Sequence, residues 1–399
     1  MARLPDGDPA PPDGALPARA LVTLRDRQFG VYVHVPFCAT RCGYCDFNTY
    51  VPGECGAEQV AGYADALIAE LELARRVLGD DAPPAQTVFF GGGTPTLLPP
   101  DTLRRILAAI PRTPDAEVTT EANPETVDPE TLAKLREAGF TRISLGMQSA
   151  VPHVLATLNR THTPGRAVQA AAEARAAGFE QVSLDLIYGT PGESAEDWET
   201  SLHTAIGAGP THISTYSLVV EPGTLLAAQV RRGEVEVPGE DVVARFEAAD
   251  RILERAGMHW YETCSWAVDE AAYCRHNLGY WRGGNWWGAG PGAHSHIGGV
   301  RWWNALHPRA WAERVTAGAS PAAAREVPDP DAARLEQVML GLRLASGVPL
   351  ADLTPAGRAA ARRQRDDGLL DPVALDAGRA VLSQKGRLLA DPVTLALAA

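Results

Sequence analysis

Three cysteines stand close together near the start of the chain, in the sequence VHVPFCATRCGYCDFNTY that covers residues 33–50. Cys38, Cys42 and Cys45 are spaced four and three residues apart, so one loop brings three thiolates to a single metal centre. Thiolates bind both zinc and iron–sulfur clusters, but a structural zinc site needs four ligands, and no second cysteine pair follows at a suitable distance. An iron–sulfur cube held at three corners leaves its fourth iron open to a small molecule.

Polar residues recur at or just beyond the ends of other apolar, β-branched runs. A glycine-rich stretch, GGGTPT from residue 91, ends the second run, and its bare backbone allows a ligand to come close. A single polar residue at such a position is more often a cap or a loop hydrogen-bond partner, but several of them beside a cysteine cluster favour a shared site. The residues concerned are Gly92, Gly93, Thr94, Glu121, Gln148, Arg160 and Asp185.

Short apolar runs alternate with helical stretches from residue 29 onward, a pattern typical of a parallel α/β fold. Gly139, Gly178 and Gly257 each stand between a helical stretch and the next strand, where glycine adopts the left-handed conformation without penalty. Six such units predict an α/β fold with an incomplete (β/α)6 TIM-like barrel rather than a closed eight-stranded one. The six predicted strands begin at residues 29, 87, 116, 141, 181 and 212.

Changes of composition divide the chain into four regions. Residues 1–28 are rich in proline and lack an apolar period, so we expect a disordered N-terminal tail. Residues 29–258 hold the units of the partial barrel. Residues 259–327 contain eight of the nine tryptophans and five of the ten histidines in a glycine-rich setting, which breaks the α/β rhythm. Residues 328–399 predict helices followed by a short hairpin, as in a small winged-helix-like domain.

The net charge of −13 comes from 36 basic and 49 acidic side chains, so we expect no nucleic acid partner. No apolar run reaches the roughly 18 residues of a membrane span, and the N-terminus lacks a secretory signal pattern, so we expect a cytoplasmic protein without a transmembrane segment. Peripheral membrane contact and a homodimer stay open. Six cysteines in a chain of 399 residues do not indicate a disulfide framework.

The spacing C-x-x-x-C-x-x-C on the loop after the first strand resembles the radical S-adenosylmethionine (SAM) superfamily, and in particular its coproporphyrinogen-oxidase-like branch. The resemblance implies a 4Fe-4S cluster on the three cysteines, with SAM chelated by the open iron and the glycines of GGGTPT near its methionyl amino end. It also implies that Glu121 and Arg160 contact the methionine moiety of SAM, and that Gln148 and Asp185 contact its amino or ribose groups. Tyr32 and Tyr44 match positions that flank SAM in this branch.

Two kinds of relative within this branch differ in the cysteine loop. Oxygen-independent coproporphyrinogen III dehydrogenases carry one more cysteine, two residues after the third, and a long N-terminal segment. This chain has Phe47 at the place of that cysteine and a proline-rich tail before the first strand. The loop therefore resembles a second family of the branch, which consists of haem chaperones.

The sequence HNLGYW from residue 276 supports that second resemblance, because it matches the motif H-N-x-x-Y-W of the haem chaperones. The resemblance implies haem bound through His276, and the rings of Tyr280 and Trp281 offer an apolar surface to a macrocycle. His294 and His296, in GAHSH, are alternative haem ligands.

The function that these resemblances imply is the binding of haem and its transfer to acceptor haemoproteins, with the cluster and SAM in a regulatory or oligomerisation role. One alternative is oxidative decarboxylation of the propionates of coproporphyrinogen III, started by a 5′-deoxyadenosyl radical. A second alternative is a radical SAM methyltransferase, for which two SAM molecules would be needed.

Overall fold

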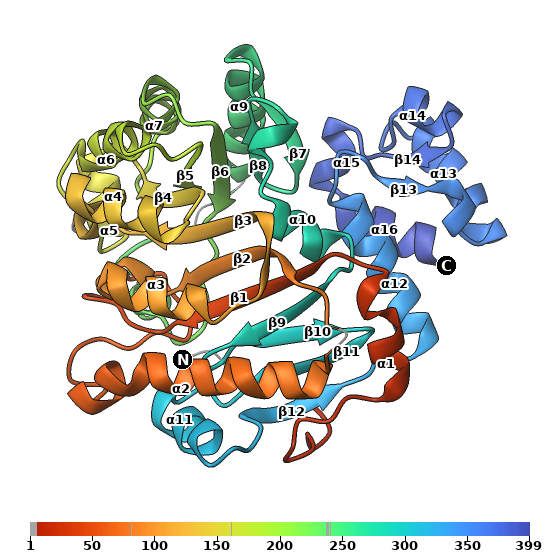
Figure 1. Cartoon of the computed structure of the whole chain (residues 1–399). Coiled ribbons are helices and arrows are strands. Elements are labelled where there is room, and N and C mark those ends of the chain that lie inside the picture. Colours follow the sequence, from red (N-terminus) through yellow and green to blue (C-terminus); the bar gives the residue numbers. More distant parts are fainter. Residues whose placement is uncertain (1–5, 81, 161, 237–238, 240) are drawn as a thin grey trace.

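The computed structural model describes residues 6–80, 82–160, 162–236, 239 and 241–399. Its central element is an open twelve-stranded sheet, in which β1 to β6 lie side by side in sequence order and run parallel, as predicted (Figure 1). The order along the sheet is β12-β11-β10-β9-β1-β2-β3-β4-β5-β6-β8-β7. The strands are β1 (Phe29–Val35), β2 (Ala85–Gly92), β3 (Arg112–Ala122), β4 (Arg142–Gln148), β5 (Gln181–Tyr188), β6 (His212–Ser217), β7 (His259–Glu262), β8 (Ser265–Ala267), β9 (Asn285–Ala289), β10 (His294–Ile297), β11 (Val300–Asn304) and β12 (Ala322–Glu326).

Helices connect the parallel strands and pack against one another along the sheet (Figure 1). Gly139, Gly178 and Gly257 have positive φ angles at the ends of three of them, which confirms the predicted glycine turns. Among the described helices, none is both long and apolar enough to cross a membrane. The helices are α1 (Ala18–Val22), α2 (Ala57–Leu78), α3 (Pro100–Ala108), α4 (Pro129–Ala138), α5 (Pro152–Thr157), α6 (Arg166–Ala176), α7 (Ala195–Gly207), α8 (Leu225–Arg231), α9 (Asp241–Arg255), α10 (Arg275–Trp281), α11 (Pro308–Thr316), α12 (Pro330–Leu342), α13 (Pro355–Asp366), α14 (Pro372–Asp376), α15 (Gln384–Leu388) and α16 (Ala390–Ala398).

Residues 259–327 do not form a separate segment, which corrects the expectation drawn from their composition. β9 pairs in parallel with β1, and β10, β11 and β12 continue the sheet in antiparallel fashion beyond it. β7 and β8 add the opposite edge next to β6. The strands are three to five residues long, too short for an alternating pattern to stand out. Most of their tryptophans are buried, as is Trp311 of α11.

The expected disorder of the N-terminal region also differs from the structure. Asp8 pairs with Arg325 of β12, so this segment lies against the edge of the sheet. Ala20 of α1 and Leu24 are buried in the main core. The expectation of disorder was based on the prolines and on the lack of a repeating apolar pattern in this segment. An extended segment can nevertheless form backbone hydrogen bonds with the edge strand of a sheet. Residues 1–5 lie outside the described residues.

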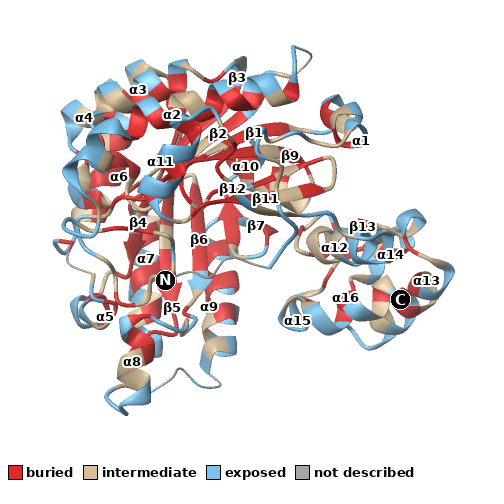
Figure 2. Cartoon of the chain, turned by 90° about the horizontal axis from the view of Figure 1, so that it is seen from below, coloured by how far each residue is buried: buried red, intermediate tan, exposed pale blue. Residues whose placement is uncertain are grey.

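The C-terminal region forms a helical module with a hydrophobic core of its own, separate from that of the sheet (Figure 2). Its two short strands, β13 (Val348–Pro349) and β14 (Arg379–Ala380), are antiparallel. They are separated in sequence by α13 and α14, so the expected hairpin of adjacent strands is wrong. Ion pairs between Arg387 and Asp250, and between Arg301 and Glu336, connect the module to the main body.

Candidate functional site

A cavity of about 400 Å³ opens at the carboxyl ends of β1 to β6, the edge where parallel sheets present their binding loops. We call it the cysteine cavity. Of the residues predicted from sequence, Tyr32, His276 and the alternative haem ligands His294 and His296 are outside its lining. The cysteine cavity is lined by the predicted residues Cys38, Cys42, Tyr44, Cys45, Gly92, Gly93, Thr94, Glu121, Gln148, Arg160 and Asp185.

The loop that carries the cysteines is held by backbone hydrogen bonds to segments on both sides. The Cys38 amide donates to the Tyr50 carbonyl at 3.0 Å, which ties the two ends of the loop together. The Gly43 amide donates to the Leu158 carbonyl, also at 3.0 Å, and anchors the middle of the loop beside α5. These two hydrogen bonds hold the cysteine loop against the segments on either side of it.

The cysteine thiols are partly buried and have polar neighbours. The Thr94 hydroxyl lies 3.9 Å from the sulfur of Cys38, and Nη1 of Arg160 lies 3.4 Å from the sulfur of Cys42. Burial raises the pKa of Cys38, and it raises the pKa of Cys45 to about 11. Neutral thiols are poor ligands, so metal binding here would release protons.

The arrangement of the thiols suits a cluster better than a single ion. Among the described residues, no group of three histidine, cysteine or acidic side chains is close enough to hold one metal ion. A cube binds each thiolate at a different iron, so its ligands need not converge on one point. Three cysteines around one cavity therefore fit a 4Fe-4S cluster held at three corners, and they do not fit a closed zinc site.

Gly92, the last residue of β2, and Gly93 bring that strand end against the start of the cysteine loop. Gly92 has a φ of +108°, and a Cβ added there would lie 2.5 Å from the ring of His34. A Cβ on Gly93 would lie 2.5 Å from the carbonyl oxygen of Phe37. Any larger residue would push the cysteine loop away from β2, so these glycines shape the cavity by close packing of protein against protein.

Two carboxyl groups lie on the floor of the cavity. Glu121 accepts a hydrogen bond from the Gly92 amide at 3.0 Å, and Asp185 accepts one from the Ser144 hydroxyl at 2.7 Å. Burial, and then the charge of Asp185, raises the pKa of Glu121 to about 7. Burial also raises the pKa of Asp185 to about 6, although the Ser144 hydrogen bond opposes this. A cationic ligand group would favour the ionised form of both.

The end of β4 is distorted around Arg160. Gln148 has a φ of +64°, a left-handed conformation that is uncommon outside glycine and often occurs at binding sites. Nη2 of Arg160 donates to the Gly146 carbonyl at 2.8 Å. A Cβ on Gly146 would lie 2.8 Å from both the Arg160 guanidinium and the Gln148 amide. Because Gly146 has no side chain, the Gln148 amide and the Arg160 guanidinium can both lie close to the end of β4.

This geometry agrees with what the chain is similar to. A model of the Radical SAM superfamily matches residues 32–205. The heme chaperone HemW of Mycobacterium tuberculosis is 52% identical over 382 residues, which cover 94% of this chain and 96% of that protein. This chain belongs to the HemW family. A second member, the heme chaperone HemW of Bacillus subtilis, is 33% identical over 79% of this chain and 84% of its own length.

The fold itself is shared with a solved radical SAM enzyme. Coproporphyrinogen III oxidase (HemN) from Escherichia coli has a TM-score of 0.79 over 95% of this chain and 92% of that one. Its sequence is 23% identical, so the likeness concerns the fold. This chain therefore shares the overall architecture of that enzyme, and its cysteine loop has Phe47, 62% exposed, two residues after the third cysteine.

Tyr32, which was predicted to flank SAM, lies beside the cysteine cavity. It lines a smaller cavity of about 250 Å³, which shares Gly92, Glu121 and Phe47 with the larger one. Its hydroxyl lies 3.0 Å from Nδ1 of His34. The tyrosine therefore packs behind the strand ends of this HemW-family protein, next to Glu121 and separate from the cysteines.

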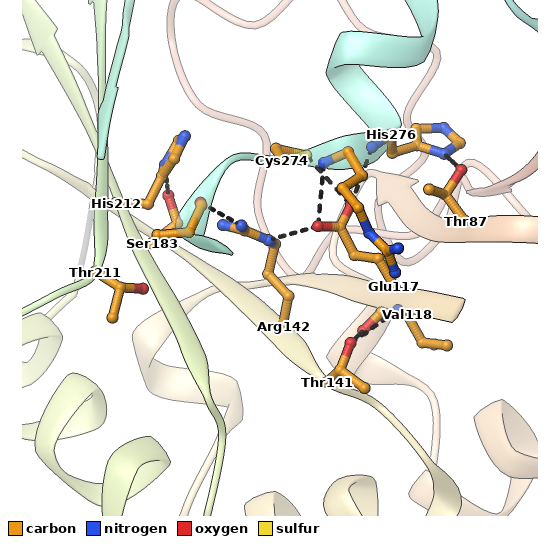
Figure 3. A network of polar contacts seen from close by, with 12 residues as sticks. Thr87, Glu117, Val118, Thr141, Arg142, Ser183, Thr211, His212, Cys274 and His276 are labelled. Atoms are coloured by element: carbon orange, nitrogen blue, oxygen red, sulfur yellow. Dashed lines mark hydrogen bonds and ion pairs between the residues drawn. The ribbon is translucent and has the colours of Figure 1, made fainter. Parts of the chain in front are cut away.

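His276, the predicted haem ligand, is buried and only 3% exposed. Its ring points toward Thr87 (Figure 3). Its Nδ1 lies 2.8 Å from the hydroxyl of Thr87, and its Nε2 lies 2.7 Å from the hydroxyl of Tyr280. Its backbone amide donates to Glu117, which pairs with Arg142. Both ring nitrogens are occupied, so the structure does not place His276 as an open iron ligand. The HemW-family motif instead builds a polar network beneath β2 and β3.

Several residues of the cysteine cavity were missed by the sequence reasoning. Tyr216 and Glu221 come from the end of β6 and the loop after it. The rule that polar residues at strand ends build the site, applied to HISTYSLVVEP, would have found them. Ser144 and Gly146 lie inside β4, and no local signal marks a serine or glycine that acts by supporting Asp185 or admitting Arg160.

Proposed function

We propose that this protein is a haem chaperone, which binds haem and transfers it to acceptor haemoproteins. The observation that carries the proposal is 52% identity, over nearly the whole of both chains, to a protein named as a heme chaperone. The second line of support is the cysteine cavity, which gathers the residues expected of a radical SAM protein.

We further propose that Cys38, Cys42 and Cys45 hold a 4Fe-4S cluster, and that SAM occupies the rest of the cysteine cavity. Glu121 and Asp185 would orient the ammonium or ribose groups of SAM, and Arg160 would pair with its carboxylate, because a guanidinium matches a carboxylate in two hydrogen bonds. When bound, the cluster and SAM supply one-electron chemistry or a regulatory signal.

Oxidation of coproporphyrinogen III is the competing function, favoured by the HemN-like fold alone. Two features of this chain weigh against it. Phe47 stands at the place of the fourth cysteine, and the described residues that line the cysteine cavity begin at Cys38, so residues 6–28 do not cover it. That segment packs instead on the far edge of the sheet, against β12.

We also propose a cytoplasmic location, because six cysteines in 399 residues, three of them clustered in one loop, are typical of metal binding in a reducing compartment.

The deciding experiment is anaerobic reconstitution of the full chain, followed by two separate assays. We expect haem transfer to an apo-haemoprotein, and no conversion of coproporphyrinogen III to protoporphyrinogen. Phe47→Cys should not create that conversion, because the missing cysteine is one of several differences. Multiple turnovers of coproporphyrinogen III by the unmodified protein, with no measurable haem binding, would make the oxidase the answer.

A further inference from the structure

A second cavity, larger than the cysteine cavity and sharing no residue with it, lies where the C-terminal module meets α10 and the strands β9 to β11. Its volume is about 680 Å³, within the range of sites that hold a compact organic cofactor. Residues from four separate parts of the chain line it, from Arg27 near the N-terminus to Arg379 of β14. We call it the arginine cavity.

The charge of its lining is opposite to that of the chain. Five arginines line the arginine cavity, against two carboxylates, Glu336 and Asp352, whereas the whole chain has 49 acidic and 36 basic side chains. Such local inversion concentrates anions at the site. The five arginines are Arg27, Arg282, Arg301, Arg334 and Arg379.

Two of these arginines keep their charge free for a ligand. Nη1 of Arg27 donates to the Gly283 carbonyl at 2.7 Å, and Nη2 of Arg379 donates to the Gly347 carbonyl at 2.9 Å. These backbone contacts orient the guanidinium groups without neutralising them. Neither arginine forms an ion pair with a carboxylate in the part of the chain that the structure describes. A ligand with two carboxylates would supply an ion-pair partner to each of these two arginines.

The same cavity has an aromatic wall. Tyr280, Trp281 and Trp286 line it, and the rings of Tyr280 and Trp286 pack edge to face with their centroids 4.7 Å apart. Flat apolar rings beside cationic groups suit a planar ligand whose charge is confined to its periphery.

His296 is placed in this wall as a metal ligand would be. Its Nδ1 lies 2.8 Å from the Gly284 carbonyl, so this nitrogen carries the proton and donates it, and the ring centroid lies 5.1 Å from that of Trp286. Nε2 makes no hydrogen bond to any residue that the structure describes. Burial lowers the pKa of His296, so the imidazole is neutral at neutral pH. A carbonyl on one nitrogen and a free lone pair on the other is the usual arrangement of metal-binding histidines.

We propose that the arginine cavity is the haem site, with Nε2 of His296 as a ligand to the haem iron and Arg27 and Arg379 as partners of the two propionates. This inference rests on the proposed haem-chaperone function. It also explains the HNLGYW motif, because His276 holds the hydroxyl of Tyr280, and Tyr280 forms part of the wall. His276 is then a positioning residue.

The test uses the full-length, cluster-loaded protein, titrated separately with haem and with metal-free protoporphyrin IX. His296→Ala should shift the Soret band and weaken haem binding about tenfold or more, while protoporphyrin binding stays unchanged because no iron is involved. The double variant Arg27→Gln/Arg379→Gln should weaken binding of both porphyrins about tenfold or more, since both carry propionates. His259→Ala, an exposed histidine of β7 that lies outside the arginine cavity, is the matched control and should change neither.

The outcomes separate this inference from the function on which it rests. If the unmodified protein binds no haem, the proposed function fails. If it binds haem, but affinity and Soret band are unchanged in both the histidine and the arginine variants, the site lies elsewhere and the inference fails alone. A Soret shift in His276→Ala, without one in His296→Ala, would also overturn it in favour of the motif histidine.

Discussion

Nε2 of His276 lies 2.7 Å from the hydroxyl oxygen of Tyr280, while its Nδ1 lies 2.8 Å from the hydroxyl of Thr87. The histidine thus joins β2 to α10, and both ring nitrogens are used within the protein. Burial lowers its pKa to about 3, so the ring stays neutral across the physiological range. The motif histidine His276 therefore has a structural role, the joining of β2 to α10, whose contribution to stability can be measured.

We expect His276→Phe to lower the free energy of unfolding. The phenyl ring keeps the shape but leaves the buried Thr87 hydroxyl without a partner, which costs about 1–3 kcal/mol. Equilibrium unfolding in urea measures the loss, with the exposed His259→Phe as the control. A change no larger than that of the control would show that these hydrogen bonds contribute little.

Replacement of any one of Cys38, Cys42 and Cys45 by alanine should abolish the 4Fe-4S cluster. In the proposed cluster each thiolate would hold a separate iron, so we expect a cube with only two protein ligands not to be retained. Iron and sulfide content and the visible spectrum after anaerobic reconstitution measure this, with Cys55→Ala as a control outside the loop. A full cluster in all three variants, or zinc bound in preference to iron, would exclude a radical SAM site.

SAM binding should strengthen as pH rises through about 7, because the pKa of Glu121 is about 7 and the ionised carboxylate attracts the cationic groups of SAM. Glu121→Gln should flatten this dependence and weaken binding at pH 8, while cluster content stays near normal. Gln148→Ala and Asp185→Ala should also weaken binding. Equilibrium binding of SAM measures these effects, and unchanged affinity in all three variants would refute the roles given to these residues.

Glu70 of α2 should make stability depend on pH. It is fully buried and accepts hydrogen bonds from the Gly290 amide, the Asn304 amide and the Trp311 indole. Burial nevertheless raises its pKa from 4.5 to about 7, so the folded state binds this proton more tightly than the unfolded state does. The stabilising contribution is present below pH 4.5 and is lost as pH rises through about 7.

Glu70→Gln removes this titration. Relative to the variant, the unmodified protein should therefore lose on the order of 1–3 kcal/mol of stability between pH 5 and pH 8. Urea unfolding of both proteins across that range measures the difference. Parallel curves would mean that the three donors hold the carboxylate ionised throughout.

The sequence alone determined the parallel strands, their order and the cysteine cavity. These depend on local signals, because apolar runs, glycine turns and the cysteine spacing are read within short windows, and parallel strands place their carboxyl ends at one edge. The sequence alone therefore predicted that Glu121, Gln148, Arg160 and Asp185 lie around the cysteines, and all four line the cysteine cavity.

Only the tertiary structure decided which residues far apart in sequence contact one another or line the same cavity. The short strands of residues 259–327 became edges of the main sheet because β1 and β6 offered unpaired backbone groups, which no local pattern records. The role of His276 depended on Thr87, nearly two hundred residues earlier, and the arginine cavity on Arg27 and Arg379, which line the same space although they lie far apart in sequence. Such contacts arise from packing between elements, so the residue types alone could name a histidine as a ligand but could not show which of its nitrogens was free.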